Sequence, residues 1–190
     1  MKFSVLTGPN FEPVSLDEAK AHLRVDHNDE DDLIATIRTA ARRKVEAETG
    51  RALIQQTVQA FWDEFPDTDT LCLPVYPAID LSNVMYTDDD GMYQVWESTN
   101  YTADLVGASP RIVRKNSVSW PDAGMYPNAV RVTYTAGSAT VGAVPAELKQ
   151  AILLEVGLLY ERREDMPING NMPGVRSASW LQFNHRTNLI

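Results

Sequence analysis

The segment 25–32 (VDHNDEDD) concentrates side chains that bind metal ions, with five carboxylates, one Asn and one His. A calcium loop of the EF-hand type takes oxygen ligands at alternate positions, glycine at the sixth and a bidentate glutamate at the twelfth. Counted from Asp26, the sixth position is Asp31 and the twelfth is Ile37, so the turn and the bidentate ligand are both missing. Carboxylates at a helix start instead cap free N–H groups and complement the helix dipole, by about 0.3–1 kcal/mol each. We therefore expect residues 29–32 to begin a helix rather than to hold a metal.

A second acidic stretch, YTDDDGMYQVWE (86–97), matches the calcium pattern at its third, fifth, sixth and twelfth positions. Tyr86 stands first, however, where a carboxylate is required. The flanking residues are typical of strands rather than helices, and Asp-Gly is a common hairpin turn. We expect a turn here and no metal.

Catalytic motifs are scarce in this chain. The histidines fall in a predicted helix (His22), a connecting loop (His27) and the C-terminal segment (His185). There is no G-x-S-x-G elbow and no H-E-x-x-H pair. The glycines of GSATVG (137–142) have P-loop spacing, but Ala and Val follow where Lys and Ser/Thr are required. We predict no catalytic residue, no metal site and no cofactor, and a protein that is not an enzyme.

Composition narrows the class of protein further. Cys72 is the only cysteine, so no disulfide can form within the chain, and a reducing compartment is the simplest interpretation. Because Cys72 lies in an apolar strand-like run, we expect it in the core. The net charge of −9 argues against a protein that binds the nucleic-acid phosphate backbone, because such binding needs clustered Lys and Arg. The longest apolar run, AILLEVGLLY, is broken by Glu155 and too short to cross a membrane, and the N-terminus does not resemble a signal peptide. These features predict a cytosolic protein with no membrane partner.

Three segments are predicted to be helices of one body. SLDEAKAHLRV (15–25) begins with a capping box, Ser15 with Glu18 three positions on. DDLIATIRTAARRKVEAETG (31–50) carries apolar residues at helical spacing and ends at a glycine. The third segment, VPAELKQAILLEVGLLYERRED, is apolar nearly all round in its middle, so we expect it to be buried against the other two.

Between the second and third helices the pattern becomes that of an antiparallel β module. The strand candidates are LIQQTVQAFW, NVMYTDDDGMYQVW, RIVRK and AVRVTYTAG, with Pro, Gly and Asp at short intervals. We divide the chain into 1–53 (N-terminal segment and two helices), 54–143 (β module), 144–164 (third helix) and 165–190 (extended tail). The predicted fold is α+β: a three-helix body with an antiparallel β module inserted between the second and third main helices, and an extended C-terminal tail.

The arginines at positions 38, 42 and 43 lie largely on the side of the second helix away from its apolar residues. Such a group usually forms a solvated helix face. Its other use is to pair with the acids of a neighbouring subunit. Both interpretations stay open at this point.

The order of these motifs carries a family resemblance. Residues 13–57 combine a Ser-Leu-x-Glu-Ala-Lys helix, Leu-Arg-Val-Asp, an acidic link, and a helix ending in Thr-Gly-Arg-Ala-Leu. LPVYPAIDLSNVMYTDDDG, AVRVTYTAG and VPAELKQAILLEVGLLYERRE follow in the same order. Over residues 13–164 the chain thus resembles the head–tail connector (adaptor) proteins of tailed bacteriophages.

The resemblance implies a structural role. In this family, copies of the chain form a ring, twelve in number, beneath the portal protein at the head vertex. A stopper or tail-completion protein assembles on the ring, and DNA passes through it without sequence-specific binding. The implied location is the virion neck, after synthesis in the cytoplasm of the bacterial host.

The resemblance also suggests which residues contact the portal, pair with a neighbouring subunit or line the lumen. The family's C-terminal arm contacts the portal, a role that here falls to Trp180, Leu181, Phe183 and Arg186. The helical body offers charges that would pair subunits or line the lumen: Asp29, Glu30, Asp31, Arg38, Arg42 and Arg43. A lumen of carboxylates would let DNA slide, because it releases no counterions there. The alternatives are another neck component, such as a stopper or tail-completion protein, or a metal- or carbohydrate-binding module that uses the acidic loops.

Overall fold

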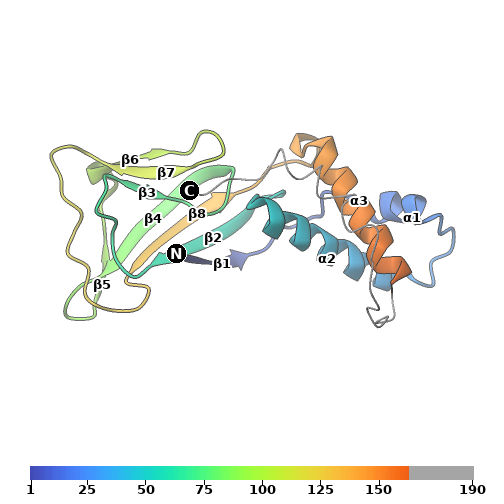
Figure 1. The fold of residues 1–190 in the computed structure, drawn as a ribbon, viewed down its shortest axis with the longest axis horizontal. Helices are drawn as coiled ribbons and strands as arrows, with labels where there is room; N and C mark the ends of the chain where they lie inside the picture. The colour runs from blue at the N-terminus through green and yellow to red at the C-terminus, as the bar shows by residue number, and fades with distance from the viewer. Residues whose placement is uncertain (163–190) are drawn as a thin grey trace, which may run out of the picture. The chain divides into compact units, whose positions relative to one another are not determined.

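The structure, a computed structural model, describes residues 1–162, and these divide into two units. A β unit consists of residues 1–10 and 55–137, and a helical unit consists of residues 11–54 and the described residues from 138 onward. Figure 1 shows the strands of the first unit and the three helices of the second. The α+β prediction is confirmed, since three helices accompany two antiparallel sheets.

The first two helices begin and end where their local sequence signals lie. α1 (Leu16–Leu23) starts with the predicted capping box: the Glu18 N–H donates to Ser15 Oγ (3.1 Å), and the Ser15 N–H donates to Glu18 Oε2 (2.6 Å). The backbone bond to Ser15 contributes most to holding the pKa of Glu18 below its usual value. α2 (Asp31–Thr49) ends at Gly50, whose φ of 68° is the left-handed conformation that glycine adopts without strain.

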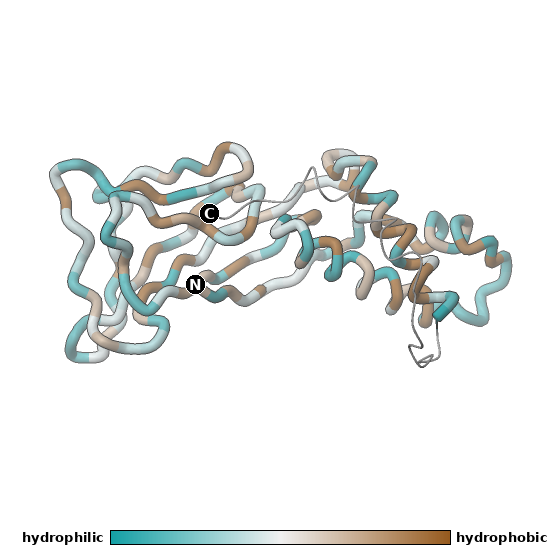
Figure 2. Tube along the Cα trace, in the orientation of Figure 1, coloured by the Kyte–Doolittle hydropathy of each residue, from teal (hydrophilic) through white to brown (hydrophobic). Residues whose placement is uncertain are grey.

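α3 (Ala146–Glu161) packs against both α1 and α2, as predicted from its apolar composition. Figure 2 shows hydrophobic residues along much of α3, whereas the link between α1 and α2 is hydrophilic. The side chains of α3 join those of the other two helices in one hydrophobic core, which includes Ala19, Ile34, Val45, Leu148 and Ile152. In the described part of the chain, no helix has the length and apolar content to span a membrane.

The β unit is built on a five-stranded antiparallel sheet in the order β1-β2-β8-β4-β5. Its strands are β1 (Lys2–Thr7), β2 (Gln56–Trp62), β8 (Val130–Ala136), β4 (Ala78–Thr87) and β5 (Tyr93–Val95). No element was expected at residues 2–7, which pair with β2, a strand fifty or more positions later in the chain. Alternate residues of β2 and β8 are buried, and they form the core face of this sheet.

The predicted Asp-Gly hairpin joins β4 to β5. Gly91 has a φ of 79°, and its N–H donates to the Asp88 carbonyl at 3.0 Å. The Asp88 carboxylate accepts from the N–H groups of Asp90 (3.1 Å) and Met92 (2.8 Å) and from Gln94 Nε2 (2.8 Å). These bonds, that of Gln94 first, lower the pKa of Asp88. The carboxylate is thus used to build the turn.

A smaller sheet completes the β unit, in the order β3-β7-β6. Its strands are β3 (Thr70–Cys72), β7 (Arg111–Arg114) and β6 (Tyr101–Asp104), and a short 3-10 turn occupies Ser98–Asn100; a second such turn, Val141–Ala143, belongs to the helical unit. Leu71 and Ile112 are its buried side chains. The core position predicted for Cys72 is wrong: its side chain is exposed, because neighbouring strand residues point to opposite faces and Leu71 takes the buried one.

Candidate functional site

The acidic link between α1 and α2 joins the helices of the helical unit. Lys20 Nζ contacts Asp31 Oδ1 (2.7 Å) and Asn28 Oδ1 (2.6 Å), which ties α1 to the start of α2. Glu30 accepts a hydrogen bond from the Tyr160 hydroxyl at the end of α3. Asp29 remains exposed, and His27 Nδ1 lies 3.8 Å from its carboxylate.

This arrangement corrects one part of the expectation for the link. Glu30 is the N-cap residue of α2, but it makes no side-chain capping hydrogen bond. Its carboxylate instead accepts the hydrogen bond from the Tyr160 hydroxyl, so the prediction that this carboxylate caps the helix is wrong. Asp31 and Asp32 lie in the first turn, where their negative charges interact favourably with the helix dipole. Within residues 1–162 no three His, Cys, Asp or Glu side chains gather as metal ligands.

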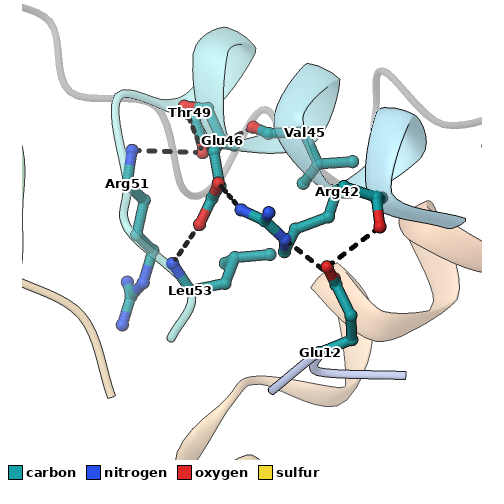
Figure 3. A network of polar contacts seen from close by, with 8 residues as sticks. Glu12, Arg42, Val45, Glu46, Thr49, Arg51 and Leu53 are labelled. Carbon is teal, nitrogen blue, oxygen red and sulfur yellow. Dashed lines mark hydrogen bonds and ion pairs between the residues drawn. The ribbon is translucent and has the colours of Figure 1, made fainter. Parts of the chain in front are cut away.

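Arg42 lies at the centre of a buried ionic network (Figure 3). Its Nε donates to Glu12 Oε2 at 2.8 Å, and its Nη1 donates to Glu46. The other oxygen of Glu46 accepts the Leu53 N–H at 2.9 Å. With 4% of its surface exposed, Arg42 does not belong to a solvated helix face, and its charge is used inside the chain.

The network includes residues of two of the three chain segments that connect the helical unit to the β unit. Glu12 follows directly after the chain enters the helical unit, and Leu53 lies just before it leaves. A third crossing is attached to the second, because the Ser138 N–H donates to the Leu53 carbonyl (3.2 Å). Burial raises the pKa of Glu46, although Arg42 and the Leu53 N–H act in the opposite direction. The sequence contained only one hint of this network, the i,i+4 spacing of Arg42 and Glu46.

The other predicted arginines differ in their surroundings. Arg38 Nη1 donates to the Val14 carbonyl at 3.2 Å, and its Nε is buried without a hydrogen-bond partner among the described residues. Arg43 is exposed. Of the six charges selected from the sequence, Asp29 and Arg43 are therefore the most available to a neighbouring molecule. The predicted tail residues, Trp180, Leu181, Phe183 and Arg186, lie outside the described part of the chain.

A second buried charge links α2 to α3. Glu155, which interrupts the longest apolar run, is buried, and its Oε2 lies 2.7 Å from Lys44 Nζ. We expect Lys44→Met to lower the free energy of unfolding by about 1–3 kcal/mol, because it leaves the carboxylate of Glu155 buried and unpaired; the half-exposed position of Lys44 limits the loss. Urea unfolding followed by circular dichroism measures the change.

The double variant Lys44→Met/Glu155→Leu is the control for this prediction. It removes both charges and should recover most of the lost stability, since an apolar pair of similar size replaces a buried ion pair at little cost. A double variant less stable than Lys44→Met alone would contradict the prediction.

An aromatic cluster in the β unit was not expected from the sequence. Trp120 packs on Phe65 (ring centroids 5.0 Å apart) and on Trp96 (4.8 Å), and its Nε1 donates to the Thr68 carbonyl at 2.7 Å. A cleft of about 380 Å³ lies beside it, lined in part by acidic residues. Trp120 has aromatic neighbours on two sides and forms part of a small core for these loops.

Comparison with known proteins gives the clearest indication of what this geometry serves. Residues 13–74 match the family of phage gp6-like head-tail connector proteins. This region is about a third of the chain, and it contains α1, the acidic link, α2, and Arg42, Glu46 and Leu53 of the ionic network, whose remaining member, Glu12, lies one residue before it. The resemblance to head–tail connectors described from the sequence is thus confirmed here. No curated protein matches the sequence.

The fold of the whole chain is shared with solved neck structures. A chain in the virion of the native gene transfer agent (GTA) particle is 24% identical, with a TM-score of 0.81 over 100% of this chain and 97% of that one. A chain in the neck of the native GTA particle, computed with C12 symmetry, is 23% identical, with a TM-score of 0.79 and the same coverage. The neck of the empty GTA particle, computed with C6 symmetry, gives 24% and 0.78. At these identities the likeness establishes the fold, both within residues 13–74 and in the rest of the β unit.

Proposed function

We propose that this protein is a head–tail connector, a structural component of the neck of a phage-like particle. Copies of the chain form a ring beneath the portal and join the DNA-filled head to the stopper or tail. The match of residues 13–74 to the connector family is the observation that carries this proposal. The fold shared with chains of a particle neck over the full length supports it.

A ring of identical copies is supported by the symmetry of the related necks, computed with C6 and C12 symmetry. In a closed ring each copy uses two different surfaces, one for each neighbour. The net charge of −9 suits a ring through which DNA passes without being held. Exposed acids such as Asp29 would then face the lumen or a neighbouring copy. No step of this role requires a catalytic group, a metal or a cofactor.

The C-terminal segment supplies the portal contact in this proposal. Large apolar side chains such as Trp180 and Phe183 are the kind that carry most of the binding energy of an interface. We expect Trp180→Ala/Phe183→Ala to bind portal-bearing heads about tenfold or more weakly than the unaltered protein. Cosedimentation of the purified protein with DNA-filled heads that lack it measures this binding.

The matched control is Asn169→Ala/Asn171→Ala, which removes two polar side chains from the same segment and should bind as the unaltered protein does. Electron microscopy of the same heads tests the function itself, by the appearance of a ring at the portal vertex. If the protein joins particles only on the tail side, after another protein has occupied the portal, it is a stopper or tail-completion protein instead.

A further inference from the structure

The β1 edge of the large sheet carries apolar side chains that nothing in the described chain covers. All six residues of β1 are exposed. Phe3 pairs with Ala60 and Val5 with Val58, and both partners are fully buried. Paired residues project from the same face of a sheet, so Phe3 and Val5 lie on the core face. Their side chains are nevertheless 53% and 45% exposed, because nothing in the described chain covers this edge. An edge strand of this kind, without proline or inward charge, is normally paired or covered.

The opposite edge carries a second apolar surface. Beside β5 lie Met92 (63% exposed), Met125 (102%) and Tyr126, which we call the hairpin patch together with Asp89 and Asp90. The Tyr126 hydroxyl donates to the Asp89 carbonyl at 3.3 Å, which holds the loop of Met125 against the turn.

A glycine keeps the two loops of the hairpin patch in contact. The Gly124 N–H donates to the Thr87 carbonyl at 2.8 Å. A Cβ at position 124 would lie 2.5 Å from the Asp88 carbonyl oxygen, so only glycine allows the loop to approach this closely. The backbones of the two loops are therefore held together, and exposed methionines such as those they carry are frequent at binding surfaces.

The two surfaces differ in charge. Asp89 and Asp90 are exposed, and their carboxylates have no ion-pair partner among the described residues. Lys2 on β1 is exposed and likewise makes no ion pair within the part of the chain described. One edge is thus apolar with a positive charge, and the other is apolar with two negative charges. Opposite charges of this kind fix the register of an interface.

We propose that, in the ring, the hairpin patch of one copy docks on the β1 edge of the next. This inference rests on the proposed connector function. Met92 and Met125 cover Phe3 and Val5, and the acids of the turn face Lys2. Because the two surfaces are different and belong to the same chain, the contact is heterologous and closes into a ring when the rotation fits.

Side chains, and not a continuous sheet, form this contact. Strands twist by about 20–25° from one to the next, so β1 and β5 diverge strongly across the five-stranded sheet. Neighbours in a twelve-fold ring turn by only about 30°, which does not bring the two edge strands into hydrogen-bonding alignment. The two edges also cannot meet within one chain: four spacings of about 4.8 Å place them about 19 Å apart.

A disulfide cross-link tests the contact directly. In a Cys72→Ser background, the variant Val5→Cys/Met92→Cys is assembled on portal-bearing heads and oxidised. A bond within one chain is excluded, because cysteines bridge only when their Cα atoms lie within about 7 Å. We expect a ladder of covalent multimers on a non-reducing gel. Each single-cysteine variant should give at most dimers, and Val5→Cys/Val106→Cys, which uses another exposed apolar residue of the β unit, should give no ladder.

A charge exchange provides the second arm. Lys2→Glu, and separately Asp89→Lys/Asp90→Lys, should lower the occupancy of the ring about tenfold at low salt, and combining them should restore it. Rings that form without a ladder, or charge variants that do not rescue each other, overturn this contact and leave the connector function standing. In that case the patch faces the next neck protein. If the unaltered protein forms no ring at the portal vertex, the proposed function is wrong, and so is this contact, which depends on it.

Discussion

Arg42→Met is expected to lower the free energy of unfolding of the helical unit by about 3–5 kcal/mol at neutral pH. The substitution keeps most of the side-chain volume but leaves Glu12 and Glu46 without the charge that compensates them. Both carboxylates are largely buried, so water cannot replace the guanidinium. Chemical denaturation followed by far-ultraviolet circular dichroism, which reports the helices, measures the loss.

The pH dependence of this loss has a defined sign. Burial already raises the pKa of Glu46 above its usual value of 4.5, and removal of Arg42 raises it further. A carboxyl whose pKa is raised by folding costs stability as the pH rises through that pKa, and costs none where it is protonated. The difference between Arg42→Met and the unaltered protein should therefore shrink as the pH falls from neutrality towards 4.5.

Two controls separate the network from the helix that carries it. Arg43→Met changes the exposed neighbour on the same helix and should alter stability by no more than about 0.5 kcal/mol. The triple variant Glu12→Gln/Arg42→Met/Glu46→Gln removes all three charges, and we expect it to recover a large part of the loss. An Arg42→Met protein that unfolds at the same denaturant concentration as the unaltered one would show that the network contributes nothing.

Tyr134→Ala should destabilise the β unit by about 3–5 kcal/mol. Tyr134 is among the largest fully buried side chains, and it lies on the central strand β8. Its hydroxyl accepts the Val75 N–H at 3.0 Å and donates to the Val75 carbonyl at 3.2 Å, which ties the segment after β3 to the large sheet. Burial raises the pKa of Tyr134, so the phenol stays protonated over the whole physiological range. Thermal unfolding monitored by tryptophan fluorescence measures the effect.

Tyr134→Phe divides this effect into its two sources. It keeps the ring and removes the hydroxyl, so it leaves the backbone groups of Val75 without their partner, at a cost of about 1–3 kcal/mol. Tyr93→Phe is the matched control, because the Tyr93 hydroxyl is exposed and bonds an arginine that water can solvate. If Tyr134→Phe were as stable as the unaltered protein, the tie through Val75 would not contribute to the β unit.

Local sequence signals were sufficient for the elements that depend on near neighbours. The capping box at Ser15 and the glycine at position 50 set two helix ends, because the hydrogen bonds involved join residues a few positions apart. The Asp-Gly turn between β4 and β5 is local in the same sense. The burial of α3 followed from its composition, since a helix that is apolar nearly all round has no solvated face. The family resemblance rested on the order of such signals.

Only the tertiary structure decided the features that depend on distant residues. Residues 2–7 become a strand because β2 pairs with them, and six residues without clear alternation gave no sign of it. Arg42 was expected on a solvated helix face or at a contact with another subunit, but it is buried, and it pairs with Glu12, thirty positions earlier. The carboxylate of Glu155 is buried in an apolar helix, and Lys44 Nζ of α2 lies 2.7 Å from it and compensates its charge. Side-chain charge is a property of the residue, whereas its environment is set by chain segments far away in sequence. That is why the sequence could select the charged residues of this protein and could not tell which of them face a neighbouring molecule.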